Sequence, residues 1–121
     1  MLPHYLVDLR TLAGVMKEVL MRQPIEKLAV KPKHLSVILQ ILAENAPLAE
    51  VWAYGSRVNG NGHEGSDLNL VVKGEADLVQ LQAAFQNSLL PMLVDIHQWE
   101  RLPIRFHTNI QANYVVLQEK K

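Results

Sequence analysis

The sequence contains no cysteine, which excludes a disulfide framework and any chemistry that depends on a thiol. It also has no excess of charge, because twelve lysine and arginine residues balance twelve aspartate and glutamate residues. Nothing in these totals draws the chain to the phosphate backbone of nucleic acid, so any contact with phosphate has to be local. Aromatic residues make up only 6% of the chain and accompany no basic stripe, which argues against a nucleic-acid-binding surface.

Long apolar runs are also missing, since no stretch approaches the roughly 18 residues that a membrane-spanning helix needs. The first ten residues, MLPHYLVDLR, carry no basic segment ahead of an apolar one. We therefore expect no secretory signal and a cytoplasmic location. With 121 residues, 49% of them hydrophobic, the chain has the length and composition of one compact globular domain.

Apolar residues recur at helical spacing in several segments. The pattern predicts helices at about residues 8–21, 32–45, 77–90 and 103–113. Prolines interrupt the helical pattern between the first two. The residues expected on the buried faces of the last three helices are Leu35, Ile38, Leu39, Leu42, Leu78, Leu81, Phe85, Leu89, Phe106 and Ile110. The apolar stripe of the first helix would be available to bind a partner protein or a second copy of the chain. In the second case the protein would be a homo-oligomer.

Strand-forming residues occupy the segments between these helices. EVWAYGS (50–56), DLNLVV (67–72) and MLVDIHQW (92–99) are predicted as strands, and YVVLQ (114–118) as a closing strand or extended tail. In the second strand Leu68, Leu70 and Val72 alternate with Asp67, Asn69 and Val71, so one face is apolar and the other carries oxygen atoms. The order of elements predicts an α/β (α+β) fold, with a short mixed β-sheet flanked by helices.

The stretch GSRVNGNGHEGSDLNL (55–70) is rich in glycine and directly follows a predicted strand. Gly55 would let the backbone approach a ligand closely, Ser56 adds a hydroxyl donor, and Arg57 adds a positive charge. If a helix begins here, its unpaired amides would face phosphate oxygens. The alternative is an ordinary connection between two strands, because Asn-Gly pairs at 59–60 and 61–62 are also common turn residues.

Oxygen-bearing side chains follow this loop on two predicted strands. Asp67 and Asn69 are two residues apart and therefore point to the same face. Asp95 would point to that face too if its strand lies alongside. Oxygen ligands suit Mg²⁺, which bridges the oxygens of a triphosphate. The set indicates phosphoryl or nucleotidyl transfer, although Asp67 alone would also serve as a turn or cap residue.

Together these motifs resemble those of the DNA polymerase β-like nucleotidyltransferase superfamily, and within it the minimal nucleotidyltransferases. The family pattern is Gly-Ser, a loop, Asp-x-Asp and a third acidic residue on a later strand. Gly55, Ser56, Asp67 and Asp95 meet it. The resemblance covers roughly residues 33–118, and it implies a minimal nucleotidyltransferase domain at 33–121 behind a helical extension at 1–32.

The resemblance also implies an activity: transfer of a nucleoside monophosphate from an NTP, with ATP expected as the donor. The implied site residues are Gly55, Ser56 and Arg57 for binding the nucleotide, and Asp67, Asn69 and Asp95 for catalysis and for binding Mg²⁺. Many such relatives are antitoxins of HEPN-domain toxins, and some of them adenylylate the toxin. A HEPN-domain partner protein is therefore expected, whereas a membrane or a nucleic acid is not.

The chain departs from the family pattern at Asn69, where the second aspartate would stand. An amide oxygen still binds Mg²⁺, but one negative charge is lost and weaker metal binding is expected. Misplacement of the reacting phosphorus would slow the transfer steeply. Two hypotheses stay open: an active transferase, and a catalytically degenerate antitoxin or binding module that acts by protein-protein contact.

Two of the five histidines lie near the predicted site. His97 shares a predicted face with Asp95, where it would act as a base or supporting residue, or else be a partly exposed strand residue. His63 lies in the loop and is expected to be solvated. The remaining histidines fall at no metal-ligand spacing, so a zinc site is not expected.

Overall fold

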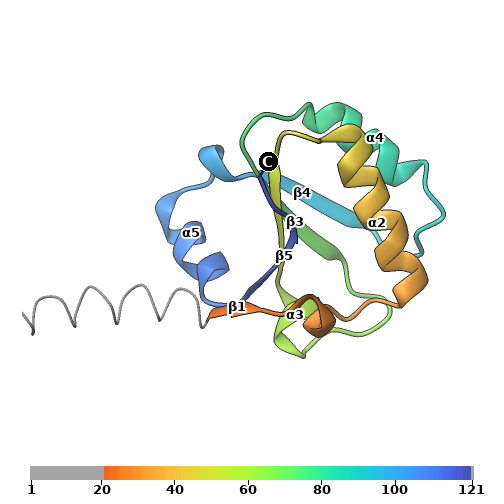
Figure 1. Ribbon diagram of the computed structural model, residues 1–121. Helices are drawn as coiled ribbons and strands as arrows, with labels where there is room; N and C mark the ends of the chain where they lie inside the picture. The colour runs from red at the N-terminus through yellow and green to blue at the C-terminus, as the bar shows by residue number, and fades with distance from the viewer. Residues whose placement is uncertain (1–20, 121) are drawn as a thin grey trace, which may run out of the picture.

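The computed structural model of the protein describes residues 21–120, so the predicted helix at 8–21 lies outside the described residues apart from Met21. Within that range the chain forms a five-stranded sheet in the order β1-β5-β2-β3-β4. Helices α2 (Pro32–Asn45) and α4 (Leu78–Gln86) cover one face of the sheet, and α5 (Ile104–Gln111) lies on the other (Figure 1). This mixed sheet between helices confirms the predicted α/β fold.

The predicted strands all form. They are β2 (Glu50–Tyr54), β3 (Leu68–Lys73), β4 (Val94–Gln98) and β5 (Tyr114–Gln118). β2 runs antiparallel to both β3 and β5, while β3 and β4 are parallel. This arrangement places β3 in the sheet between β2 and β4, which fixes the surroundings of Asn69.

The sheet has a further strand that the sequence analysis does not predict. β1 (Arg22–Gln23) pairs with β5 in parallel and is followed by the short 3-10 helix η1 (Ile25–Lys27). A strand of two residues shows no alternation that a sequence pattern could reveal. Leu28, next along the chain, is buried in the core. The described part of the segment 1–32 therefore contributes a strand and a core residue, whereas the domain division at residue 32 stays a prediction.

Helices α2, α4 and α5 form at their predicted positions. Pro32 is the first residue of α2, where its missing N–H costs no hydrogen bond. Ile38 and Leu42 are fully buried on the inner face of this helix. Asp77 caps α4, because its side chain accepts a hydrogen bond from the backbone N–H of Gln80 at 3.0 Å.

Two residues predicted on buried helix faces are exposed, and those two predictions are wrong. Leu89 is 97% exposed because α4 ends at Gln86, so Leu89 lies beyond the helix instead of on its inner face. Phe106 is 43% exposed because the short α5 buries Ile110, one turn later, against the sheet.

The sheet separates two apolar clusters. The larger one lies under α2 and α4 and contains Leu68, Leu70 and Val72, as the alternation in this strand predicts. The smaller one lies under α5, where the rings of Trp52 and Tyr114 stack with their centroids 4.0 Å apart. Val71 is fully buried in this second cluster. The sheet face that carries Asn69 is therefore polar at the start of β3 and apolar farther along it.

Candidate active site

A row of residues crosses three neighbouring strands on the sheet face that α5 partly covers. Tyr54 of β2 is the register partner of Asn69 of β3, and Asn69 is the register partner of Asp95 of β4. Asp67 lies immediately before β3, two residues ahead of Asn69, and therefore on the same side. The fold thus brings together the three oxygen-bearing residues that the sequence analysis selects.

Both carboxylates of this group are accessible. Asp67 and Asp95 are exposed, and they line a common cavity of about 670 Å³ between α4 and the edge strand β4. A substrate would therefore reach both side chains without a rearrangement of the core. Accessibility of this kind is expected of residues that bind a ligand rather than stabilise the fold.

Gly55 connects β2 to the short helix α3 (Ser56–Asn59), which confirms that a helix opens at the Gly-Ser pair. Its backbone angles, φ 88° and ψ −154°, belong to a region that is almost restricted to glycine. A Cβ atom at this position would lie 2.6 Å from Nδ2 of Asn69. The loop backbone and the Asn69 amide are therefore packed directly against each other, which only glycine allows.

Arg57 is buried, and its guanidinium group donates hydrogen bonds to backbone carbonyls. The distances are 2.6 Å to the oxygen of Ala29, 2.8 Å to that of Glu64 and 2.9 Å to that of Ser66. These bonds tie the glycine-rich loop to the segment ahead of α2. Contact between Arg57 and a nucleotide stays a prediction, while the observed hydrogen bonds position the loop.

Asp95 interacts with two neighbours on its face of the sheet. Nε2 of His97 lies 3.1 Å from Oδ2 of Asp95, and the two side chains are 42% and 57% exposed. The pKa of Tyr54 is raised above its ordinary value, first because the phenol is half-buried and second because Asp95 carries a negative charge nearby. Tyr54 could not be predicted as a site residue from the sequence, because an aromatic residue in a strand is usually a packing residue.

The oxygen donors of Asp67, Asn69 and Asp95 suit a divalent cation, but only two of the three side chains carry a negative charge. Among residues 21–120, no cluster of three or more histidine, cysteine, aspartate or glutamate side chains is placed to hold a metal ion. Asp67 and Asp95 are two carboxylates, and the third oxygen comes from the amide of Asn69. Oxygen donors of this kind suit Mg²⁺, although the set carries one charge fewer than three carboxylates would.

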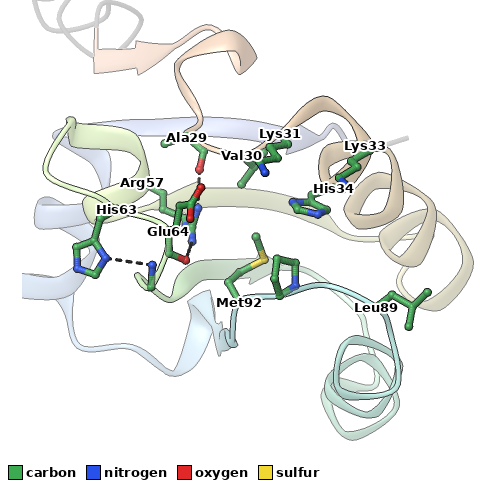
Figure 2. Close-up of a pocket in the computed structure, with 12 residues that line it drawn as sticks. Ala29, Val30, Lys31, Lys33, His34, Arg57, His63, Glu64, Leu89 and Met92 are labelled. Carbon is green, nitrogen blue, oxygen red and sulfur yellow. Dashed lines mark hydrogen bonds between the residues drawn. The ribbon is translucent and has the colours of Figure 1, made fainter.

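Another cavity, of about 720 Å³, is lined by none of these three residues (Figure 2). Lys31, Lys33 and His34 line it on one side and the loop with His63 and Glu64 on another. Nδ1 of His63 accepts a hydrogen bond of 3.0 Å from the backbone N–H of Gly65. The cavity has a basic lining that could not be predicted from the sequence, because its residues come from segments that are distant along the chain.

The comparisons with known proteins agree with this geometry. The sequence profile of the family described as "Polymerase beta, Nucleotidyltransferase" matches residues 36–121. The chain belongs to this family. It is also 37% identical over 100 residues to the "Probable protein adenylyltransferase MntA" of Haemophilus influenzae, a match that covers 78% of this chain and 88% of that protein.

Membership confirms the predicted family, fold and enzyme class of this nucleotidyltransferase. The matched region includes the Gly-Ser loop, β3 and β4, which hold all the predicted site residues. The described residues of this nucleotidyltransferase include no helix that is long and apolar enough to cross a membrane.

Proposed function

We propose that the protein is a protein adenylyltransferase that moves AMP from ATP to a side chain of a partner protein. The observation that carries the proposal is the contact between Gly55 and Asn69 beside Asp95, because it joins the glycine loop to the oxygen-bearing strands. The relative named as a protein adenylyltransferase supports the choice of ATP as donor and of a protein as acceptor.

The donor would be held by the loop and the strands together. Gly55 and Ser56 would bind the triphosphate, with Arg57 fixing the loop that surrounds it. Asp67, Asn69 and Asp95 would hold Mg²⁺. When bound, the ion would neutralise charge on the triphosphate oxygens and on the departing pyrophosphate.

The transfer itself forms one bond to phosphorus and breaks another. The oxygen of an acceptor hydroxyl attacks the α-phosphorus of ATP, and the bond from that phosphorus to the oxygen bridging to the β-phosphate breaks. Pyrophosphate leaves, and AMP stays on the acceptor as an ester. The acceptor proton passes to the Asp95 carboxylate, whose hydrogen bond to His97 holds it in place.

The acceptor that this proposal favours is a HEPN-domain protein, with the present chain acting as its antitoxin in the cytoplasm. This choice comes from the resemblance to minimal nucleotidyltransferases and from the exposed position of Asp67 and Asp95, which a folded protein could reach. A small helical protein encoded next to this chain would be the first acceptor to purify.

The test uses ATP labelled either on the α-phosphate or on the γ-phosphate, together with the purified acceptor and Mg²⁺ or Mn²⁺. We expect label on the acceptor from the α-position only, and loss of that label in Asp67→Ala. Glu75→Ala is the matched control, because Glu75 is an exposed carboxylate outside the site. Absence of label from both forms of ATP would contradict the proposal, and label from the γ-position would indicate a kinase.

Asn69 favours a second candidate function, in which the chain neutralises its partner by contact alone. The missing carboxylate weakens the expected metal site, and Asn69→Asp would restore it. Calorimetry of Mg²⁺-ATP binding on both proteins separates the two functions. Binding by the unaltered protein supports transfer. Binding by Asn69→Asp alone, together with full neutralisation by Asp67→Ala, supports contact.

A further inference from the structure

β4 is an edge strand, because among the described residues it pairs only with β3. Along any strand, the backbone N–H and C=O groups of successive residues point to opposite sides of it. The backbone N–H of Leu68 donates to the carbonyl of Leu93 at 2.8 Å, so Leu93 and the alternate residues after it, Asp95 and His97, face β3. Ile96, which lies between those two, therefore turns both of its backbone groups to the open side of the sheet.

The open side of β4 is covered at one end only. The outward carbonyl of Val94 accepts a hydrogen bond of 2.9 Å from Nε2 of Gln82 in α4. No described residue bonds to the N–H or the carbonyl of Ile96. β4 also contains neither proline nor lysine, two residues with which proteins commonly block an exposed edge. The edge at Ile96 is therefore open to pairing with another chain.

This open edge runs directly beside the candidate active site. Asp95 belongs to β4, and its side chain lies on the sheet face that carries Asn69. Residues opposite one another on paired antiparallel strands place their side chains on the same face, with Cβ atoms about 4.5–5.5 Å apart. A residue of an added strand that paired with Asp95 would therefore bring its side chain next to the Asp95 carboxylate.

The cavity of about 670 Å³ extends from this edge to the other face of the sheet. Besides Asp67 and Asp95, its lining includes the apolar side chains of Phe85, Leu90 and Val94, which belong to or pack against the cluster under α2 and α4. Neighbouring side chains of an extended segment point to opposite faces. The neighbour of a residue paired with Asp95 would therefore point to this apolar side of the cavity.

We propose that a segment of the acceptor protein binds as an additional strand along β4. Backbone hydrogen bonds to the outward N–H and carbonyl of Ile96 hold the segment. Its hydroxyl-bearing residue pairs with Asp95, and an apolar neighbour of that residue enters the cavity beside Phe85. The segment therefore needs an extended backbone and a hydroxyl next to an apolar side chain. The inference rests on the proposed function, in which Asp95 takes the acceptor proton.

Hydrogen exchange followed by NMR tests the added strand on the unaltered full chain. The probe is the acceptor protein that takes the α-phosphate label, with Mg²⁺ and α,β-methylene-ATP, which cannot be cleaved at the bond that the transfer breaks. Without the acceptor, the amide of Ile96 should exchange faster than those of Asp95 and His97, because only the latter two are bonded to β3. The acceptor should slow the exchange of Ile96.

Two results of this measurement would overturn the added strand. One is an Ile96 amide that is already protected in the free protein, as pairing between the β4 edges of two copies would produce. The other is an Ile96 amide whose exchange does not change when the acceptor binds. Mass spectrometry should also place AMP on a residue with an apolar neighbour, and a labelled residue without one would contradict the proposed pairing.

Ile96→Pro tests the same contact through activity. It removes the outward N–H without removing a bond to β3, and edge strands tolerate proline at such positions. Ile96→Ala is the matched control, because it loses the same side chain and keeps the N–H. Relative to this control, Ile96→Pro should lower kcat/KM for the acceptor about tenfold or more, the effect of roughly one hydrogen bond, and leave Mg²⁺-ATP binding unchanged.

The outcomes separate the docking from the transfer. Equal kcat/KM in Ile96→Pro and Ile96→Ala would overturn the added strand and leave the proposed transfer intact. Absence of label on the acceptor with the unaltered protein would overturn the proposed function, and the added strand with it. If Ile96→Pro does not fold, as circular dichroism would reveal, the hydrogen exchange of the unaltered protein decides the matter.

Discussion

At the scale of single residues, Gly55 is the position on which the candidate site depends most closely. We expect Gly55→Ala to destabilise the fold by about 2 kcal/mol or more, since the backbone region it occupies costs other residues about 1–3 kcal/mol. The new Cβ would also lie 2.6 Å from Nδ2 of Asn69 and displace that amide. The proposed ATP binding should also be lost. Chemical denaturation would measure the change in stability, and calorimetry the loss of binding.

Two further variants separate the causes of this effect. Gly60 also has a positive φ, 89°, but a Cβ there would meet nothing within 4 Å. Gly60→Ala should therefore cost only the backbone strain and leave ATP binding in place. Adding Asn69→Ala to Gly55→Ala should recover part of the stability. An unchanged stability in that double variant would show that the collision with Asn69 does not matter.

Tyr54 reports on the charge of Asp95, and this gives a pH-dependent prediction. The pKa of Tyr54 is higher in the folded protein than in the unfolded one. Tyr54 therefore stabilises the fold at pH values below the ordinary pKa of tyrosine, and this contribution is lost as the pH rises through the folded pKa. Asp95→Asn should lower the pKa of Tyr54, but not fully to its ordinary value, because burial remains.

Absorbance titration of the tyrosines measures this change, with Tyr54→Phe used to subtract the other phenols. Glu75→Gln is the control, since it removes a carboxylate that does not face Tyr54. A Tyr54 titration that is the same in Asp95→Asn as in the unaltered protein would show that the two groups do not interact.

At the scale of elements, Arg57 connects the glycine-rich loop to the segment ahead of α2 through its bonds to the carbonyls of Ala29, Glu64 and Ser66. We expect Arg57→Ala to lower the free energy of unfolding by about 2–4 kcal/mol, because hydrogen bonds to a charged group contribute about 1.5–3 kcal/mol each and water recovers part of the loss. Chemical denaturation measures the difference.

The matched control is Arg101→Ala, because Arg101 is exposed in the short helix η2 (Trp99–Arg101). A surface change of that kind should alter stability by no more than about 0.5 kcal/mol. If Arg57→Ala were as stable as Arg101→Ala, the buried guanidinium would not be what holds the loop.

The elements differ in how far the sequence predicts them. β3 and α2 carry regular alternation and helical spacing, so both their positions and their buried faces are as predicted. The predicted burial of Leu89 and Phe106 is wrong, because periodicity does not show where a short helix ends or which of its turns contacts the sheet. In the site, spacing along one strand pairs Asp67 with Asn69, but the register that adds Tyr54 depends on long-range packing.

At the scale of the whole molecule, the segment from Met21 to Lys31 joins the predicted N-terminal region to the nucleotidyltransferase domain. Its strand β1 forms one edge of the sheet, Leu28 lies in the main core, and Ala29 accepts from Arg57. These roles could not be predicted from the sequence, because the segment is interrupted by Pro24 and has no long periodic pattern. The segment is nevertheless bonded to the loop that bears the candidate site.

Two truncations test whether this segment is part of the fold. A chain that lacks residues 1–20 should still unfold cooperatively, because the described residues form their own core. A chain that lacks residues 1–30 should be less stable by about 4 kcal/mol, since it loses the burial of Leu28, about 2 kcal/mol, and the bond from Arg57 to Ala29. Equal stability of the two chains would show that β1 and Leu28 are dispensable. Sedimentation of the first truncation also tests the predicted homo-oligomer, because an unchanged number of subunits would mean that the helix predicted at 8–21 does not join two copies.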